Sequence, residues 1–393
     1  MGSLRIIALD LGKFKTVACV MNAADRGHVF ETIEMSPQAV HDLLARHATA
    51  DPRDTRVVLE TCDCAGWVHD VCVSLGLLAV VVAANSEAWK WQRVKRKTDR
   101  DDALKLARLA LLDQLTAVYV PDPARRQVRR LILHRRSVVS RRTQSRNTVR
   151  SIFSQQGIAL ARGGKQWTKA GVEQLKEHAK PLDQCDDELD LWRGRLQVEL
   201  DLIEAVDRQL KLIDRKLDEL QEDDEAIQRL QAVKGVGPRV AEAVVSHLGD
   251  ARRFKSARHV AGYAGLVPKL MESGQMSRSG HITRRGPALL RSMLVEAAWV
   301  VWRHNAWAQA FVTKVSRGSK ARRKIAIVAL ARKLLVMLWA MLRDGTEWRD
   351  PCRPRRVEQD QGADGRFASG GERASPPEDT RAVNVAVSSV AAG

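Results

Sequence analysis

A long helical pattern crowded with arginine constrains this chain more than any other feature. Apolar residues recur at helical spacing from Ala124 to Ile158, and no acidic residue occurs between Asp122 and Glu173. Arginine fills the pattern at Arg125, Arg126, Arg129, Arg130, Arg135, Arg136, Arg141, Arg142, Arg146 and Arg150. We therefore expect one long basic helix between whatever folds before it and after it.

A second long helix is predicted from Asp187 to Gln231. Its apolar residues follow heptad spacing, with one break at Glu199. The two helices, joined around Gly163-Gly164, predict an antiparallel coiled-coil hairpin or a dimerisation arm over residues 123–228.

The segment before the arm reads as alternating strands and helices. Arg5 to Leu9 and Thr16 to Val20 predict a hairpin around Gly12. Arg56 to Leu59 and Leu77 to Ala83 are two more apolar runs of strand length. This order predicts a mixed α/β sheet in a domain over residues 1–122.

The segment after the arm, residues 229–345, predicts a mostly helical domain with glycine-rich breaks near 235 and 274–286. Residues 346–393 are rich in Pro, Gly, Ser, Asp and Arg and predict a disordered tail. A chain of 393 residues is long enough for two such domains and their connections.

The charge of the chain points to a polyanionic partner. It has 65 Lys+Arg against 47 Asp+Glu, a formal net charge of +18 and a pI near 10.0. Such an excess attracts nucleic acid above all. The chain starts without a signal peptide, and Arg332 and Lys333 interrupt its most apolar stretch, Ile325 to Leu342, so we expect a cytoplasmic protein that does not span a membrane. Its six cysteines do not form a disulfide framework.

Four acids stand where a sheet domain places catalytic carboxylates. Asp10 ends the first strand before Gly12, and Glu60 ends the strand Val57-Val58-Leu59. Asp99 and Asp102 share one face at the start of a helix. Four converging carboxylates need cations, and oxygen ligands select hard ions such as Mg²⁺, which serve phosphoryl transfer on nucleic acids.

Other interpretations stay open for this region. With Thr98 as N-cap, the acids Asp99, Asp101 and Asp102 also complement a helix dipole. Asp10 with Gly12 also opens actin-like sugar kinases, although no second glycine-rich phosphate loop follows. Four nearby residues could form a zinc set, although buried thiols are the more common role: Cys62, Cys64, His69 and Cys72.

A second group of residues suits contact with a nucleic-acid backbone. Lys234-Gly235-Val236-Gly237-Pro238 between two helices is typical of a helix-hairpin-helix, whose turn offers backbone N–H groups to a phosphate. An ordinary turn between helices is the alternative.

A serine follows in glycine-rich surroundings. Ser273 precedes Gly274, with arginines downstream at Arg278, Arg284 and Arg285 that suit a phosphodiester. Spacing alone leaves Ser277 and Ser279 as rival nucleophiles.

These motifs together resemble the DEDD insertion-sequence transposases, from about residue 4 to 345. The resemblance rests on Asp10-Leu11-Gly12, Leu59-Glu60, Lys97-Thr98-Asp99-Arg100-Asp101-Asp102-Ala103, Gly265-Leu266-Val267-Pro268, Ser273-Gly274, Arg285-Gly286, Leu290-Arg291 and the closing Ala331-Arg332-Lys333-Leu334-Leu335. One departure is the turn from Thr61 to Gly66, where the family pattern is richer in glycine.

The resemblance implies a Holliday-junction-resolvase-like (RuvC-like) RNase H fold, with Asp10, Glu60, Asp99 and Asp102 as Mg²⁺ ligands. It implies a C-terminal transposase domain in which Ser273 links covalently to DNA, and a composite centre formed across the subunits of a dimer or tetramer. It also implies a structured guide RNA that pairs with donor and target DNA, for which the basic helix 125–150 is a suitable seat. A metal-only nuclease of the junction-resolvase kind is the alternative function, and an inactivated regulator is disfavoured because all four acids and the serine are present.

Overall fold

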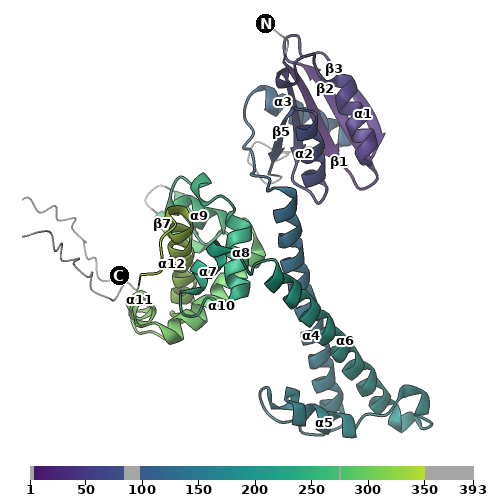
Figure 1. Ribbon diagram of the computed structural model, residues 1–393, viewed down its shortest axis with the longest axis vertical. Helices are drawn as coiled ribbons and strands as arrows, with labels where there is room; N and C mark the ends of the chain where they lie inside the picture. The colour runs from purple at the N-terminus through teal and green to yellow at the C-terminus, as the bar shows by residue number, and fades with distance from the viewer. Residues whose placement is uncertain (1–3, 84–97, 274–275, 350–393) are drawn as a thin grey trace, which may run out of the picture. The chain divides into compact units, whose positions relative to one another are not determined.

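The structure is a computed structural model that describes residues 4–83, 98–273 and 276–349 (Figure 1). Within these ranges the chain forms an N-terminal sheet domain, a pair of long helices, and a helical C-terminal region that carries a two-stranded hairpin. Most of the segment predicted as a disordered tail, from Asp350 onward, lies outside the described residues.

The N-terminal domain is built on a five-stranded sheet in the order β3-β2-β1-β4-β5. The strands are β1 (Arg5–Leu11), β2 (Lys15–Asn22), β3 (His28–Glu34), β4 (Thr55–Glu60) and β5 (Leu78–Val82). The pairs β1–β2 and β2–β3 are antiparallel, whereas β1–β4 and β4–β5 are parallel. The predicted hairpin, the two later strands and the mixed α/β sheet are thereby confirmed.

Strand β3 has no counterpart in the sequence-based prediction. It is an edge strand beside β2, and none of its residues is buried. Because an edge strand with no buried residue needs no run of large apolar side chains, its sequence carries no pattern that predicts a strand.

Helices cover both faces of this sheet (Figure 1). One face packs on α1 (Pro37–His47) and α2 (Ala65–Ser74), and the other packs on α3 (Asp99–Leu111). A short 3-10 turn, η1 (Pro52–Asp54), leads into β4.

The alternation of a strand decides which residues meet which helices. In β1, Ile7 and Leu9 belong to the core with α1 and α2, whereas Ile6 and Ala8 belong to the core with α3. In β4, Val58 lies on the α3 side. Asp10, two residues after Ala8, and Glu60, two residues after Val58, therefore also fall on the α3 side.

The two predicted long helices are α4 (Pro123–Gln155) and α6 (Leu191–Glu219). They run antiparallel, since Arg135 pairs with Asp214 and Arg142 pairs with Asp207. An apolar cluster around Val149, Phe153 and Leu196 and a smaller one around Val138 and Val206 lie between them. An antiparallel pair of long helices is thus present as predicted.

The prediction of one continuous helix from Asp187 to Gln231 was wrong. The helix ends at Glu219, and α7 (Glu225–Gln231) begins anew after Asp224, whose carboxylate accepts from the N–H groups of Ala226 and Ile227. An aspartate that caps a new helix favours a break there over continuation.

The connection between the two long helices is also more than a glycine loop. It contains α5 (Lys169–Glu177) and three 3-10 turns, η3 (Lys165–Trp167), η4 (Leu182–Gln184) and η5 (Glu188–Asp190).

The C-terminal region packs its helices around one large apolar core. Its elements are α8 (Pro238–Leu248), η6 (Ala251–Arg253), α9 (Ala257–Tyr263), the hairpin of β6 (Pro268–Ser273) and β7 (Met276–Ile282), α10 (Ala288–His304), α11 (Ala306–Ser316) and α12 (Arg323–Asp344). The hairpin occupies the glycine-rich break for which the sequence predicted only irregular chain.

Helix α12 is, among the described residues, the one helix long and apolar enough to cross a membrane, and half of its most apolar window is buried inside the fold. Its leucines pack in the C-terminal core. The Lys333 ammonium lies over the rings of Trp307 and Phe311, at 5.4 and 4.8 Å from their centroids. A core helix accommodates the charge of Lys333 in this way.

Candidate active site and nucleic-acid interface

The strand register brings Asp10 and Glu60 to neighbouring positions. Leu9 pairs with Leu59 across parallel strands, and the two acids follow directly. By alternation both belong to the face that α3 covers. The carboxyl ends of adjacent parallel strands are where open α/β sheets bind ligands.

The N-terminus of α3 adds acids to the same face. Asp102 is 8% exposed in the first turn, and the helix packs on β1 through Ala103 and Leu106. Asp99 is exposed at the first position of the helix.

Asp101 has a different role from its neighbours. It forms a capping box with Thr98: the threonine hydroxyl accepts from the Asp101 N–H, and the carboxylate of Asp101 accepts from the Thr98 N–H at 3.1 Å. The capping interpretation is therefore correct for Asp101, which leaves Asp99 and Asp102 as the candidate ligands.

The donor set fits a hard divalent cation by its chemistry, because it offers only carboxylate oxygens from one side of a sheet. The described parts of the chain nevertheless contain no group of three His, Cys, Asp or Glu side chains gathered closely enough to hold an ion. The acids share a face without forming a finished coordination shell.

The cysteines near Glu60 separate into two kinds. The Sγ atoms of Cys62 and Cys64 lie 3.3 Å apart in the turn after β4, where Cys62 is exposed. Cys72 lies on the buried side of α2, and burial raises the pKa of its thiol to about 12. Burial, followed by the hydrogen bond with Cys62, raises the pKa of Cys64 to about 11. The zinc alternative that includes His69 finds no support among the described residues.

Many arginines of α4 are engaged within the protein. Arg135 and Arg142 pair with Asp214 and Asp207 on α6. Arg126 pairs with Asp70 of α2 and donates to the Pro121 carbonyl at 2.6 Å. These guanidinium groups hold the helix to its neighbours.

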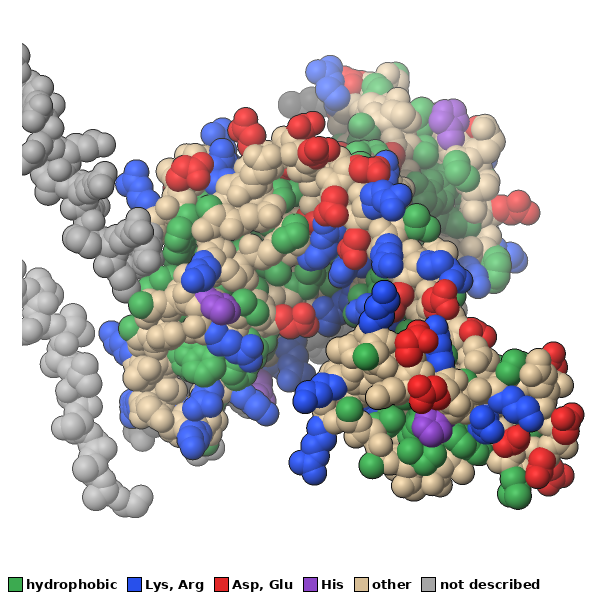
Figure 2. Space-filling view, turned by 60° about the horizontal axis from the view of Figure 1, so that its bottom comes forward, with side chains coloured by type: hydrophobic (Ala, Val, Ile, Leu, Met, Phe, Trp, Pro, Cys, Tyr) green, Lys and Arg blue, Asp and Glu red, His purple; other side chains and the backbone are tan. Residues whose placement is uncertain are grey.

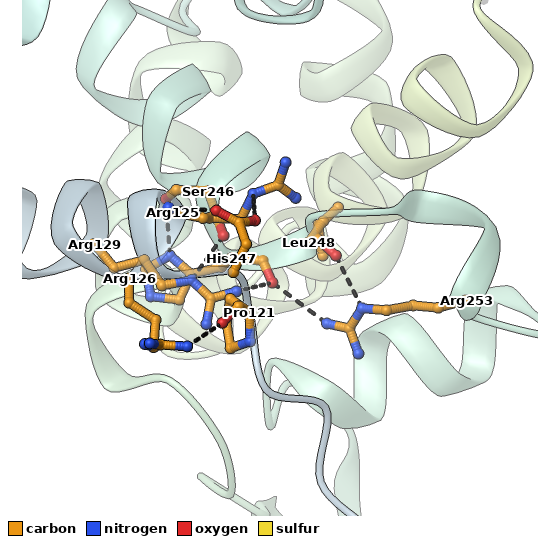
Figure 3. Close-up of polar contacts among 9 residues, drawn as sticks. Pro121, Arg125, Arg126, Arg129, Ser246, His247, Leu248 and Arg253 are labelled. Carbon is orange, nitrogen blue, oxygen red and sulfur yellow. Dashed lines mark hydrogen bonds and ion pairs between the residues drawn. The ribbon is translucent and has the colours of Figure 1, made fainter. Parts of the chain in front are cut away.

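Arg129 joins α4 to the end of α8 (Figure 3). Its guanidinium donates to the carbonyls of Ser246 and His247 at 2.7 and 3.0 Å, and burial lowers its pKa. Arg253 donates to the carbonyls of Leu248 and His247 from a second direction. Two cations thus satisfy the last carbonyls of α8 and complement its dipole.

Other guanidinium groups of α4 remain at the surface. Arg125 pairs with Asp122 beside it, and Arg130 donates to the Asp63 carbonyl at 3.2 Å. Arg136 donates to Ser292 Oγ at 2.6 Å, and Arg141 is exposed. On the face drawn in Figure 2, Lys and Arg side chains lie interspersed with Asp and Glu.

The glycine turn before α8 is held in place by contacts with α10 and with the residue that follows it. Gly235 has φ +100° and lies so close to α10 that a Cβ would meet the Val301 N atom at 3.0 Å. The Asn305 side chain, 8% exposed, donates to the Lys234 carbonyl at 2.7 Å. Gly237, the N-cap of α8, faces open space and no side chain caps the helix. Pro238 at the first helical position has no N–H, and the Val240 N–H donates to the Gly237 carbonyl at 3.1 Å, so the Arg239 N–H is the donor of this first turn that suits an anion. Sequence analysis missed Asn305, and no local pattern marks it.

Ser273 is the last residue of β6. It pairs with Met276, and Met271 pairs with Arg278, so Ser273 and Arg278 occupy the same face of the hairpin ladder. Ser277 pairs with Glu272, and Ser279 pairs with Leu270, so the rival serines take the alternate positions. The register therefore groups Ser273, rather than its rivals, with Arg278.

The base of this hairpin is tightly constrained. Gly286 has φ +83°, and a Cβ there would lie 1.9 Å from the Tyr263 carbonyl oxygen. Arg284 adopts φ +55°, which is uncommon for a residue other than glycine. Arg291 of α10, part of the Leu290-Arg291 motif singled out in the sequence, donates to the carbonyls of Ala264 and Arg285 at 3.1 and 3.4 Å. Burial and the nearby Arg284 lower the pKa of Arg291.

Comparison with known families gives two matches that together span most of the described chain. Residues 7–157 match a model described as a transposase, of the DEDD type of IS110, and residues 227–313 match the transposase IS116/IS110/IS902 family. The first match covers the sheet domain and α4, and the second covers α7 through α11.

Individual relatives agree with these models. The chain is 32% identical over 256 residues to a probable family 20 transposase of Pseudomonas aeruginosa, covering 64% of this chain and 74% of that one. It is 27% identical to the transposase for insertion sequence element IS1111A of Coxiella burnetii, covering 73% and 77%. An uncharacterized 43.6 kDa protein of insertion element IS110 from Streptomyces coelicolor is 30% identical, over 36% of this chain and 35% of that one.

Proposed function

This chain belongs to the IS110 family of DEDD transposases and is a DNA transposase, and on that basis we propose that it cuts and rejoins DNA strands through a serine–DNA covalent intermediate. The observation that carries the proposal is the presence of two separate groups of reactive residues: the acids on the α3 face of the sheet, and Ser273 with arginines at and below the β6–β7 hairpin.

The first group binds a divalent metal in this proposal. DEDD transposase domains generally depend on divalent metals, and Asp10, Glu60, Asp99 and Asp102 would hold Mg²⁺. When bound, the metal activates a nucleophile and stabilises a leaving oxygen. The carboxylates would hold the ion at the carboxyl ends of β1 and β4, on the face of the sheet that α3 covers.

The second group carries the transfer step. The Ser273 hydroxyl oxygen attacks a phosphorus atom and forms a phosphoserine ester, while the P–O bond to the departing strand breaks and that strand leaves as a hydroxyl. In the rejoining step a strand hydroxyl attacks the phosphoserine and releases Ser273. Arg278, Arg284 and Arg285 neutralise the phosphate during both steps.

Several elements serve as a nucleic-acid interface in this proposal. The turn Lys234-Gly235-Val236-Gly237 acts as a helix-hairpin-helix that grips a DNA phosphate, with the Arg239 N–H at the start of α8 as a backbone donor. The outward arginines of α4, including Arg130, Arg136 and Arg141, receive a structured non-coding guide RNA. In this proposal the α4–α6 pair is a coiled-coil arm.

The assembly and location follow the same proposal. The chain works as a homo-oligomer, a dimer or tetramer, on donor and target DNA in the bacterial cytoplasm at the nucleoid. A composite site with the metal group from one subunit and Ser273 from another requires such an assembly.

A metal-dependent nuclease like the Holliday-junction resolvases is the second candidate. It is favoured by one observation: the acids lie on a complete sheet domain that does not include Ser273. Such an enzyme cleaves without linking itself to DNA.

One experiment separates the two. The full-length protein is incubated with labelled element ends and target DNA, then denatured, and protein–DNA adducts are resolved by electrophoresis. We expect an adduct in the wild type and in Ser277→Ala and Ser279→Ala, none in Ser273→Ala, and strong loss in Asp10→Asn. Cleavage without any adduct, or full activity of Ser273→Ala, contradicts the serine mechanism.

A further inference from the structure

We propose that Cys62 and Cys64 form an oxidant-sensitive dithiol that closes reversibly to a disulfide in the turn beside Glu60. The two Sγ atoms lie 3.3 Å apart, which is within hydrogen-bonding distance, and no covalent bond joins them. Cys62 is exposed, so a small oxidant reaches it directly.

No other described cysteine offers such a pair. Cys19 and Cys72 are fully buried in the two cores of the sheet domain, and Cys185 lies next to the η4 turn of the arm. The one cysteine outside the described residues is Cys352. Oxidation of the two adjacent thiols is therefore local to the turn after β4.

The chemistry requires a two-electron oxidant, and a hydroperoxide is sufficient. The Cys62 sulfur attacks the peroxide oxygen, the O–O bond breaks, and Cys62 becomes a sulfenic acid with release of water or an alcohol. The Cys64 sulfur then attacks the Cys62 sulfur and forms the S–S bond, and the hydroxyl leaves as water. A dithiol reductant reverses the reaction by thiol–disulfide exchange.

The turn that holds this pair is tied to functional elements on both sides. Thr61 follows Glu60 and donates its N–H to the Val82 carbonyl at 2.9 Å. Cys64 caps α2, since its carbonyl accepts from the Val68 N–H at 3.3 Å. Between the two cysteines, the Asp63 carbonyl accepts from Arg130 of α4 at 3.2 Å.

Closing the disulfide draws the two sulfurs from 3.3 Å to a covalent distance of about 2.05 Å. Because the turn spans a single residue between them, we expect Asp63 and the peptide groups next to Glu60 to move. Oxidation therefore displaces an acid of the metal group and loosens the Arg130 contact, which switches DNA cleavage off. This consequence for activity rests on the proposed function, whereas the disulfide itself does not.

The test uses full-length protein treated with hydrogen peroxide, then alkylated in denaturant and mapped by mass spectrometry. We expect Cys62 and Cys64 to escape alkylation with loss of two hydrogens, while Cys72 is alkylated. Reduction with dithiothreitol before alkylation should restore both thiols. Finding both thiols free after oxidation, or finding Cys62 overoxidised with no disulfide, overturns the proposal.

The second readout is DNA cleavage before oxidation, after oxidation and after reduction. We expect a reversible loss of at least about tenfold, the scale on which small shifts of active-site groups act. Cys62→Ser and Cys64→Ser should resist peroxide, while Cys185→Ser should respond as the wild type does. Equal loss in the serine variants, or a disulfide that leaves cleavage unchanged, contradicts the switch. A reduced protein that never cleaves DNA contradicts the proposed function instead, and the thiol measurement still decides the disulfide.

Discussion

The guanidinium of Arg129 donates to the main-chain carbonyl of His247 at 3.0 Å, and the same carbonyl accepts from Arg253 and from the Tyr263 hydroxyl. One oxygen at the end of α8 thus receives three donors, one of them from α4. These contacts hold α4 and α8 together (Figure 3).

Replacing Arg129 with Ala should destabilise the protein. It leaves the Ser246 carbonyl without its Arg129 donor and removes the contact between α4 and α8, at a cost of about 2–3 kcal/mol. Urea unfolding measures the change. Arg141→Ala, at an exposed site on the same helix, is the matched control and should change stability by less than about 0.5 kcal/mol. Equal effects from both substitutions would contradict the capping role.

Stability should also fall with mild acid because of His247. Burial lowers its pKa from 6.5 to about 4, while its Nδ1 lies 2.8 Å from the Ala243 carbonyl. Between these values the unfolded chain binds a proton that the folded chain does not. The contribution of neutral His247 to the unfolding free energy is therefore complete above pH 6.5 and is lost as the pH falls towards 4. It reaches at most about 3 kcal/mol.

The comparison that isolates this effect is His247→Gln, which cannot titrate. The difference in unfolding free energy between wild type and variant should shrink between pH 7 and pH 4 as the wild type loses stability. A difference that stays constant over this range would show that His247 does not carry the acid sensitivity.

Two adjacent acids should behave differently when each becomes an amide. Asp102→Asn removes a proposed metal ligand and should reduce DNA cleavage by orders of magnitude with little loss of stability. Asp101→Asn alters the capping box with Thr98 and should lower stability by about 0.5–1 kcal/mol while cleavage persists. Cleavage assays with thermal unfolding of both variants provide the check, and the reverse pattern would exclude the assignment.

The arginines of α4 should divide into two groups by their effect on nucleic-acid binding. Arg141→Ala removes an exposed charge and should reduce the slope of log K against log salt by about 1. Arg142→Ala breaks the pair with Asp207 and should lower stability with little change in that slope. Binding titrations over a range of salt concentrations distinguish them, and an unchanged slope for Arg141→Ala would remove it from the interface.

The sequence is most informative where a local pattern determines the structure. The apolar run before Asp10 predicts β1 because both faces of that strand are buried, and the helical spacing after Ala124 predicts α4 because one face of that helix is buried. The family resemblance also follows from local motifs and is borne out by the family models.

Features that depend on distant partners are harder to predict. The sequence shows that α4 is basic, but it does not show that Asp214 and Asp207 face Arg135 and Arg142, or that Arg129 meets residues 117 positions away. Asn305 donates to the Lys234 carbonyl across 71 positions of the chain. Edge strand β3 and the break before Glu225 escaped prediction because neither needs a distinct apolar pattern.

The order in which the acids occur along the chain also bears on how the protein is synthesised. Asp10 and Glu60 come from β1 and β4, whereas Asp99 and Asp102 come from α3, which follows all five strands of the sheet along the chain. A nascent chain that has not yet reached α3 therefore lacks two of the four acids. Under the proposed mechanism, any hazard to the host genome begins only once α3 has been synthesised and has packed on the sheet.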